Sequence, residues 1–287
     1  MNTSLSVRTE TEASVRSIIL CRPDKYNAIT PALRDELAAA IDEADADPDV
    51  RVILLAAEGP AFCAGYELDW STQLQSAEAT AERVWDSVTD MRMMSRFVNT
   101  YMKLWYASKP TIVAVQGWCI GGGTDMVLCA DMIIAGEGAS FGYPPSRVWG
   151  IPTTAMWVYR IGLERAKRYL LTGDEIPAPE AARIGLILET VPDEQLQEYA
   201  RAFARRMAQV PTSQLIMLKL LCNQMVENMG LTSSRSLGTL FDGIARHTQE
   251  GRDFVARAIE VGFRQTVRER DDQFGDYGSG PRGKKRK

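Results

Sequence analysis

The stretch GWCIGGGTDMVLCAD (residues 117–131) places three consecutive glycines between two apolar segments, and this feature constrains the fold most. The β-branched run TIVAVQG (111–117) before it is typical of a buried strand, and residues 124–130 after it include good helix formers. Fixing a glycine costs backbone entropy, so three together indicate a turn or a close approach that a side chain would obstruct. The pattern predicts a strand, a glycine turn and the start of a helix.

Such a turn suits either a ligand or tight packing of a helix on a sheet. The first amides of a helix have no partner within it, and the helix dipole makes that end positive, so a developing anion is favoured there. Nucleotide-binding loops are disfavoured. No Lys follows the glycines as G-x-x-x-x-G-K-[ST] requires, and GGGTDM lacks the last glycine of G-x-G-x-x-G.

Strand and helix patterns alternate through the first two thirds of the chain, which is typical of an α/β fold. Thr30 and Pro31 are an N-cap and a first helical residue for the helix that follows the first strand. Strands are predicted at 16–21, 51–57, 111–117, 131–136 and 186–191, and helices at 124–130, 154–173, 178–184, 193–210, 213–230 and 250–273. We therefore predict an α/β core (1–192), a helical C-terminal region (193–274) and a flexible basic tail (275–287).

Composition and charge exclude several classes of function. The chain has a net charge of −4, although its last six residues, RGKKRK, carry five positive charges, so the remainder is more acidic still. Such a body disfavours nucleic-acid binding. Five cysteines without a C-x-x-C pair, no long apolar run and no signal-peptide core favour a soluble, cytoplasmic protein with no membrane partner. The single histidine, His247, lies in a polar helical stretch and is expected at the surface, so no metal site is predicted.

Four ordered motifs resemble one family. CRPDKYNAITPAL (21–33) resembles N-R-P-x-x-x-N-A, and AFCAGYEL (61–68) resembles F-x-A-G-x-D-L. Residues 117–144 resemble G-x-x-x-G-G-G-x-E-L…C-D…A…F-x-x-P, and residues 170–192 resemble L-T-G-x-x-x-x-A-x-E-A-x-x-x-G-L-V-x-x-V-x-P. Over residues 10–270 the chain is similar to the crotonase (enoyl-CoA hydratase/isomerase) superfamily.

The resemblance implies a spiral of ββα units with a helical C-terminal trimerisation region, assembled as a homotrimer or a dimer of trimers. It also implies an acyl-CoA substrate, with no cofactor other than the CoA that the substrate carries. The family holds an enolate-like oxyanion with two backbone amides, which fall by position on Tyr66 and Gly122. The residues that fall on the family's CoA-binding segments are Lys25, Tyr26, Ala28, Ala64, Gly65, Glu67 and Leu68.

The chain departs from the family's hydratases at both of their glutamates. One position holds Asp125 and the other Pro145, which has no titratable group. Asp125 is a candidate acid or base, although an acid in a first helical turn is also favoured by the dipole alone, which is expected to lower its pKa. Tyr143 and Arg147 flank the lost glutamate and are candidates for holding or protonating the substrate, or for packing.

Several activities therefore stay open. The leading prediction is an enoyl-CoA hydratase/isomerase-like enzyme, a lyase or an isomerase. Its alternatives are a thioester hydrolase, a carbon–carbon bond enzyme and a catalytically silent acyl-CoA-binding protein. All six tryptophans lie between residues 70 and 157, where the family builds its acyl site. Packing explains most of them, but a subset lining a broad pocket would favour a bulky or ring-containing acyl group.

Overall fold

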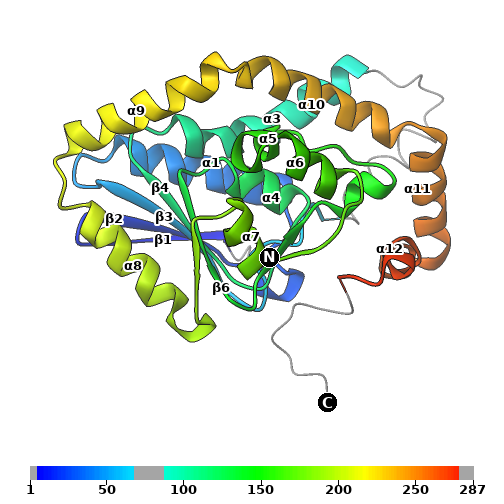
Figure 1. Cartoon of the computed structure of the whole chain (residues 1–287), viewed down its shortest axis with the longest axis horizontal. Helices are drawn as coiled ribbons and strands as arrows, with labels where there is room; N and C mark the ends of the chain where they lie inside the picture. Colours follow the sequence, from blue (N-terminus) through cyan, green and yellow to red (C-terminus); the bar gives the residue numbers. More distant parts are fainter. Residues whose placement is uncertain (1–4, 68–86, 278–287) are drawn as a thin grey trace.

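The computed structural model describes residues 5–67 and 87–277, and a six-stranded sheet runs through it (Figure 1). In spatial order its strands are β1 (Val7–Glu12), β2 (Val15–Leu20), β3 (Val52–Ala57), β4 (Thr111–Val115), β6 (Met132–Gly136) and β9 (Glu189–Val191). The β1–β2 pair is antiparallel and the other neighbouring pairs are parallel. A smaller sheet joins β5 (Trp118–Ile120), β7 (Ser140–Gly142) and β8 (Ile176–Pro177). The α/β fold class is confirmed.

Both faces of the large sheet are covered, which explains why strands such as β3 are apolar throughout. Ile53 faces a core shared with α1 (Pro31–Ala46) and α3 (Ser87–Tyr106), whereas its neighbour Leu54 faces α8 (Leu196–Met207). The larger of these cores also includes residues on both sides of the triple glycine, such as Cys119 and Met126, so the core packs against the segments that flank the turn.

Predicted helix ends agree where a capping residue marks them. The Thr30 side chain accepts a hydrogen bond from the Leu33 amide at 3.2 Å, with Pro31 as the first residue of α1. Helix α7 (Ala178–Ile184) ends at Gly185, whose φ of +85° places it in the left-handed region.

Two long predicted helices are each interrupted by a glycine. Gly162, with a φ of +76°, divides the predicted 154–173 helix, and Gly262, with a φ of +83°, divides the predicted 250–273 helix. The apolar period continues across a single residue, so the pattern did not reveal either break. The resulting elements are α5 (Met156–Ile161), α6 (Leu163–Leu170), α11 (Gln249–Val261) and α12 (Phe263–Asp271).

Within the described residues, every element after β9 is helical. Helices α9 (Thr212–Asn228) and α10 (Leu231–Arg246) run along one side of the core, and α11 and α12 extend beyond it (Figure 1). Lys219 of α9 anchors this layer through an ion pair with Asp131 at 2.9 Å. The remaining elements are the short helix α4 (Gly122–Val127) and the 3-10 turns η1 (Pro23–Lys25), η2 (Pro144–Arg147), η3 (Asp193–Gln195) and η4 (Asp272–Phe274).

The start of the predicted flexible tail is packed against the core. The Tyr277 hydroxyl donates to the carbonyl oxygen of Gly173 at 2.8 Å, and Asp276 pairs with Arg147. Residues 276 and 277 are therefore packed rather than flexible, because their side chains have partners in the core, and the predicted tail from residue 278 onward lies outside the described residues. No helix among residues 5–67 and 87–277 is long and apolar enough to cross a membrane.

Candidate active site

The predicted turn lies at Gly121, and Gly122 and Gly123 begin α4. The strand predicted at 111–117 is β4, and the unpredicted β5 lies between it and the turn. Gly121 has a φ of +55°, a conformation that favours glycine. At the next two glycines, Gly122 and Gly123, neighbouring atoms leave no room for a side chain. A Cβ on Gly122 would lie 2.8 Å from the Tyr66 ring, and a Cβ on Gly123 would lie 2.7 Å from the Cys63 carbonyl oxygen. The glycines therefore let two chain segments approach each other closely.

Two backbone segments meet beside this turn. The Cys63 amide donates to Trp118, and the Ile120 amide donates back to Cys63, both at 3.0 Å. Just beyond these contacts, the amides of Tyr66 and Gly122 donate to no acceptor among the residues that the structure describes. Both residues line the same cavity. Backbone donors without a partner at a cavity wall are available to a ligand.

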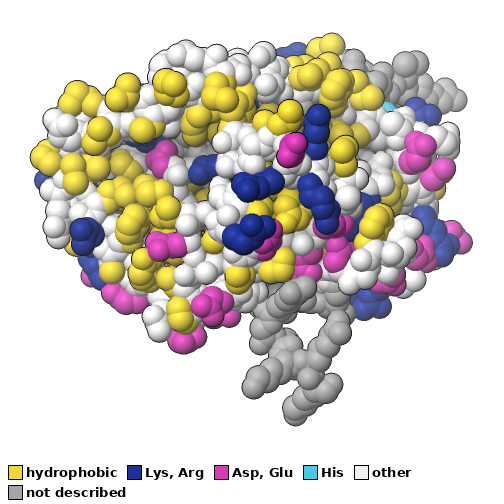
Figure 2. Space-filling view, in the orientation of Figure 1, with side chains coloured by type: hydrophobic (Ala, Val, Ile, Leu, Met, Phe, Trp, Pro, Cys, Tyr) yellow, Lys and Arg dark blue, Asp and Glu magenta, His cyan; other side chains and the backbone are white. Residues whose placement is uncertain are grey.

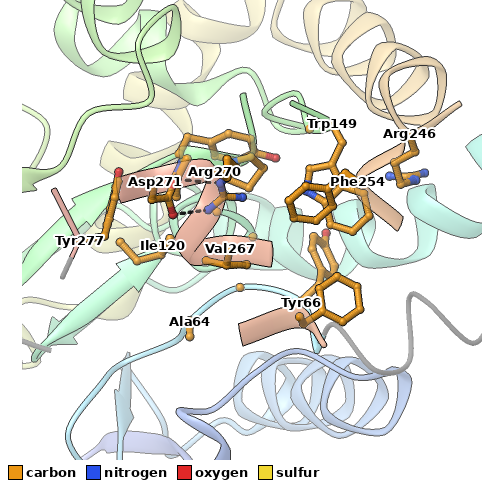
Figure 3. A pocket seen from close by; sticks show the side chains of 18 of the residues that line it. Ala64, Tyr66, Ile120, Trp149, Arg246, Phe254, Val267, Arg270, Asp271 and Tyr277 are labelled. Carbon is orange, nitrogen blue, oxygen red and sulfur yellow. Dashed lines mark hydrogen bonds and ion pairs between the residues drawn. The ribbon is translucent and has the colours of Figure 1, made fainter. Parts of the chain in front are cut away.

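The cavity has a volume of about 400 Å³ and lies between the glycine turn and the C-terminal helices. One wall is aromatic: the ring centroids of Trp149 and Phe254 lie 4.8 Å apart, and those of Phe254 and Phe263 lie 6.2 Å apart. Figure 3 shows Trp149 and Phe254 together, with Tyr66 nearby. Such a wall suits an apolar ligand, and the adjacent amides supply a few directed polar contacts.

Asp125 is fully buried and is not among the residues that line the cavity. Its carboxylate accepts hydrogen bonds from the Thr153 amide (3.2 Å), the Thr153 hydroxyl (2.9 Å) and the Thr154 hydroxyl (3.3 Å). Burial raises the pKa of Asp125 to about 7, against the effect of these hydrogen bonds. The expectation of a lowered pKa is therefore wrong, because loss of hydration outweighs the dipole and the donors.

Tyr143 and Arg147, the two candidates on either side of Pro145 in the segment after β7, have different surroundings. Pro145 and Tyr143 line the cavity, and the buried Tyr143 hydroxyl donates to the Ile151 carbonyl at 2.9 Å. Arg147 does not line it. Its side chain is only 2% exposed and pairs with Asp271 at 2.9 Å and Asp276 at 2.7 Å. Arg147 is thus a packing residue, whereas Tyr143 is positioned to contact a ligand.

Sequence reasoning missed a charged cluster on the cavity wall. It consists of Asp242 and Arg246 on α10 and Asp90 on α3. In sequence, an Asp four residues before an Arg is typical of an ordinary helix surface, so nothing marked it. The prediction for His247 is corrected here as well. It follows α10, is half-buried and lines the cavity, with Nδ1 2.8 Å from the Gly243 carbonyl oxygen.

Known proteins share this arrangement of elements. A family model described as enoyl-CoA hydratase/isomerase matches residues 10–257. The chain belongs to the enoyl-CoA hydratase/isomerase family. A crystal structure of an enoyl-CoA hydratase from Mycobacterium smegmatis is 44% identical, with a TM-score of 0.90 and 95% of each chain covered. The predicted membership of the crotonase superfamily, and its α/β fold with a helical C-terminal region, are confirmed.

Two relatives extend the comparison within the enoyl-CoA hydratase/isomerase family. A probable enoyl-CoA hydratase from Mycobacterium bovis is 30% identical over 94% of this chain and 97% of its own length. A hydroxycinnamoyl-CoA hydratase-lyase from Pseudomonas fluorescens is 30% identical over 70% of this chain and 72% of its own length. Membership of this family supports an enzyme that acts on acyl-CoA.

Only part of the predicted CoA-binding segments lies at the cavity. Tyr26, Ala64 and Gly65 line it. Glu67 forms an ion pair with Arg22 at 3.1 Å and lies 4.0 Å from the Lys25 amine. The Ala28 carbonyl accepts a hydrogen bond from the same Arg22 guanidinium. Leu68 lies outside the described residues. The structure thus brings three of the seven predicted residues to the cavity and gathers three more around Arg22.

The tryptophans divide between the cavity and the core. Trp118 and Trp149 line the cavity, Trp105 and Trp157 are buried without reaching it, and Trp70 and Trp85 lie outside the described residues. In the part of the chain that the structure describes, no three His, Cys, Asp or Glu side chains are grouped to hold a metal ion.

Proposed function

We propose that the chain acts on acyl-CoA thioesters and stabilises an enolate-like oxyanion with the amides of Tyr66 and Gly122. The observation that carries this proposal is a pair of amides, from two adjoining segments at the wall of one cavity, that have no acceptor among the described residues. Donors fixed in such surroundings stabilise charge more strongly than water does, and losing one costs about 2.7–4 kcal/mol of barrier. We expect no cofactor beyond the CoA of the substrate.

Efficient hydration of a straight-chain enoyl-CoA is not the reaction that we propose. Family hydratases use two carboxylates, as the resemblance implies, whereas here Pro145 carries none and the Asp125 carboxylate is held by Thr153 and Thr154. Double-bond isomerisation and carbon–carbon cleavage pass through an enolate, and thioester hydrolysis passes through a tetrahedral oxyanion at the same carbonyl oxygen. Each of these reactions needs fewer groups than hydration. We propose a reaction of that kind.

We further propose that the acyl group is bulky or contains a ring. The wall formed by Trp149, Phe254 and Phe263 supports this, because aromatic rings pack well on one another. The name of the hydroxycinnamoyl-CoA relative also specifies a ring-bearing acyl group. The CoA portion would enter past Tyr26, Ala64 and Gly65, with the 59% exposed Lys25 as a nearby cation for its phosphates.

Binding of acetoacetyl-CoA tests the oxyanion pair, because its enolate absorbs in the near ultraviolet and its keto form does not. We expect the wild type to give the enolate band and Gly122→Ala to lose it, since the added Cβ would displace the Tyr66 ring. Gly138→Ala is a matched control, since its Cβ would meet Asp193 at 2.5 Å, away from the cavity. An undiminished band in Gly122→Ala would contradict the assignment.

Two further readouts separate the alternatives. Crotonyl-CoA hydration by the wild type is expected to be slow, and fast hydration would contradict a non-hydratase reaction. Thermal stabilisation by acyl-CoA, without an enolate band and without turnover, would instead identify a catalytically silent binder.

A further inference from the structure

Asp242, Arg246 and Asp90 form a buried charged cluster in which the guanidinium is shared unequally. Arg246 Nη2 lies 2.9 Å and 2.7 Å from the two oxygens of Asp90. Arg246 Nη1 donates to one oxygen of Asp242, Oδ2. Among the residues that the structure describes, the other oxygen of Asp242, Oδ1, accepts only the 3.3 Å hydrogen bond from the Ile151 amide. Asp242 Oδ1 is thus the weakly engaged acceptor of the cluster.

The cluster also carries an excess negative charge. Two carboxylates face one guanidinium, and Asp90 and Asp242 are only 8% and 5% exposed. A buried carboxylate without a full counter-charge is costly and has a strong affinity for a proton. Burial accordingly raises the pKa of Asp242, although Arg246 acts in the opposite direction.

This excess charge faces the same cavity as the amides of Tyr66 and Gly122. All three members of the cluster line the cavity that Tyr66 and Gly122 also line. Burial raises the pKa of the Tyr66 phenol, and the charges of Asp125 and Asp242 raise it further. The Tyr143 phenol responds to the same two carboxylates. Asp242 and the proposed oxyanion site are therefore within electrostatic reach of each other.

The other buried acids near the cavity, Asp125 and Asp271, are held by other partners, whereas Asp272, which also lines the cavity, is exposed, and Asp276 pairs with Arg147. Asp125 is buried away from the wall and accepts three hydrogen bonds from threonines. Asp271 lines the cavity, but its oxygens are held by Arg147 at 2.9 Å and by Arg270 at 2.8 Å and 2.6 Å. Figure 3 shows Arg270 and Asp271 in contact with each other, on the opposite side of Trp149 and Phe254 from Arg246.

We propose that Asp242 is the proton-transfer residue of this site, with Arg246 and Asp90 as its positioning residues. The inference rests on the proposed function, because the charge released by proton transfer needs the Tyr66 and Gly122 amides. It assigns the missing acid–base group to α10, more than one hundred residues from the glycine turn.

The proposed step conserves charge and atoms. An oxygen of Asp242 takes a proton from the carbon next to the thioester carbonyl, and the C–H electron pair forms the double bond of the enolate. The carbonyl π pair moves to the oxygen held by Tyr66 and Gly122, so the negative charge passes from the cluster to the oxyanion. The carboxylic acid then returns its proton to that carbon or, in an unsaturated chain, to the γ carbon.

Deuterium uptake by 3-phenylpropionyl-CoA in D₂O, followed by mass spectrometry, tests the step without knowledge of the natural product. We expect Asp242→Asn to slow uptake by about a hundredfold or more, the usual effect of losing a general base. Its acetoacetyl-CoA enolate band should persist, because that equilibrium depends on the amides. The control is Asp131→Asn, which removes a carboxylate that pairs with Lys219 at 2.9 Å away from the cavity and should leave uptake nearly unchanged.

Asp242→Asn is expected to fold, since Asp90 and Arg246 then form a balanced pair. If it does not, Asp242→Ala with added formate replaces it, and uptake that rises with formate supports the proposal. Uptake at the wild-type rate in Asp242→Asn, or loss of uptake in Asp125→Asn alone, would overturn this inference and leave the proposed function standing. A wild type with neither uptake nor the enolate band would overturn both.

Discussion

Asp125 shows how burial decides the behaviour of a single side chain. Its pKa is about 7 in the folded chain, against an ordinary value of 3.8, mainly because burial removes the carboxylate from water. Between these two values the folded state holds a proton that the unfolded chain has lost. Raising the pH across this window therefore lowers the free energy of unfolding, by about 1.4 kcal/mol per pH unit for one proton. The contribution is complete below the window and lost above it.

Asp125→Asn should remove this pH dependence. Asparagine keeps an oxygen acceptor for the Thr153 amide but cannot ionise, so the variant should gain stability relative to the wild type as the pH rises through the window. Unfolding by denaturant at several pH values measures the difference. A stability difference that is constant with pH would contradict the raised pKa.

At the level of elements, the Arg147 guanidinium joins η2 to the segment that runs from the end of α12 past η4. Arg147 contacts Asp271 at the end of α12 and Asp276 beyond η4, and it lies 3.9 Å from the centroid of the Phe274 ring. These contacts hold the segment that closes one end of the cavity. The sequence predicted Arg147 to lie beside the site, and in the structure its ion pairs hold the C-terminal segment in place there.

Arg147→Met should destabilise the chain by about 3–5 kcal/mol, because it breaks a buried ion-pair network, leaving Asp271 with Arg270 alone and Asp276 without its arginine. Thermal unfolding measures the loss, and hydrogen exchange should show faster opening of α12 and η4 than of the sheet. Arg257→Met is the matched control, since Arg257 also binds two acids, Glu260 and Glu269, but at the exposed surface, where ion pairs contribute little. Equal effects of the two substitutions would rule out an anchoring role.

At the scale of the whole molecule, α9 and α10 present an apolar surface (Figure 2). Leu221 and Met225 on α9 are 68% and 65% exposed, and Phe241 on α10 is 45% exposed. Contiguous apolar surface of this kind usually marks a protein interface. The trimer implied by the family resemblance stays a proposal, and this surface supports it.

Leu221→Glu with Met225→Glu should lower the assembly state, because two charges would be buried at the proposed interface. Light scattering after size-exclusion chromatography should change from a trimer or hexamer mass to a monomer mass. Leu171→Glu, on a leucine that is 82% exposed outside these helices, serves as the control and should not change the mass. A monomeric wild type would contradict the proposed assembly.

The elements that local rules govern were predictable from sequence. Thr30 and Pro31 begin α1, Gly185 ends α7, and Gly121 turns the chain between β5 and α4. Each depends on the conformational preference of one residue and on its nearest neighbours. The breaks at Gly162 and Gly262 were missed because a helical period continues across them.

By itself, the sequence determined the α/β alternation, the family and the glycine turn, because these depend on periodicity and on backbone preferences within a few residues. Which acids reach the cavity depends on contacts between segments that are distant in sequence. The tertiary structure buries Asp125 beneath the turn, holds Arg147 among acids from the chain end, and brings Asp242 from α10 and Asp90 from α3 onto one guanidinium at the cavity wall. Hydration and counter-charges set the protonation of a carboxylate, and both depend on residues that are distant in sequence and adjacent only after folding.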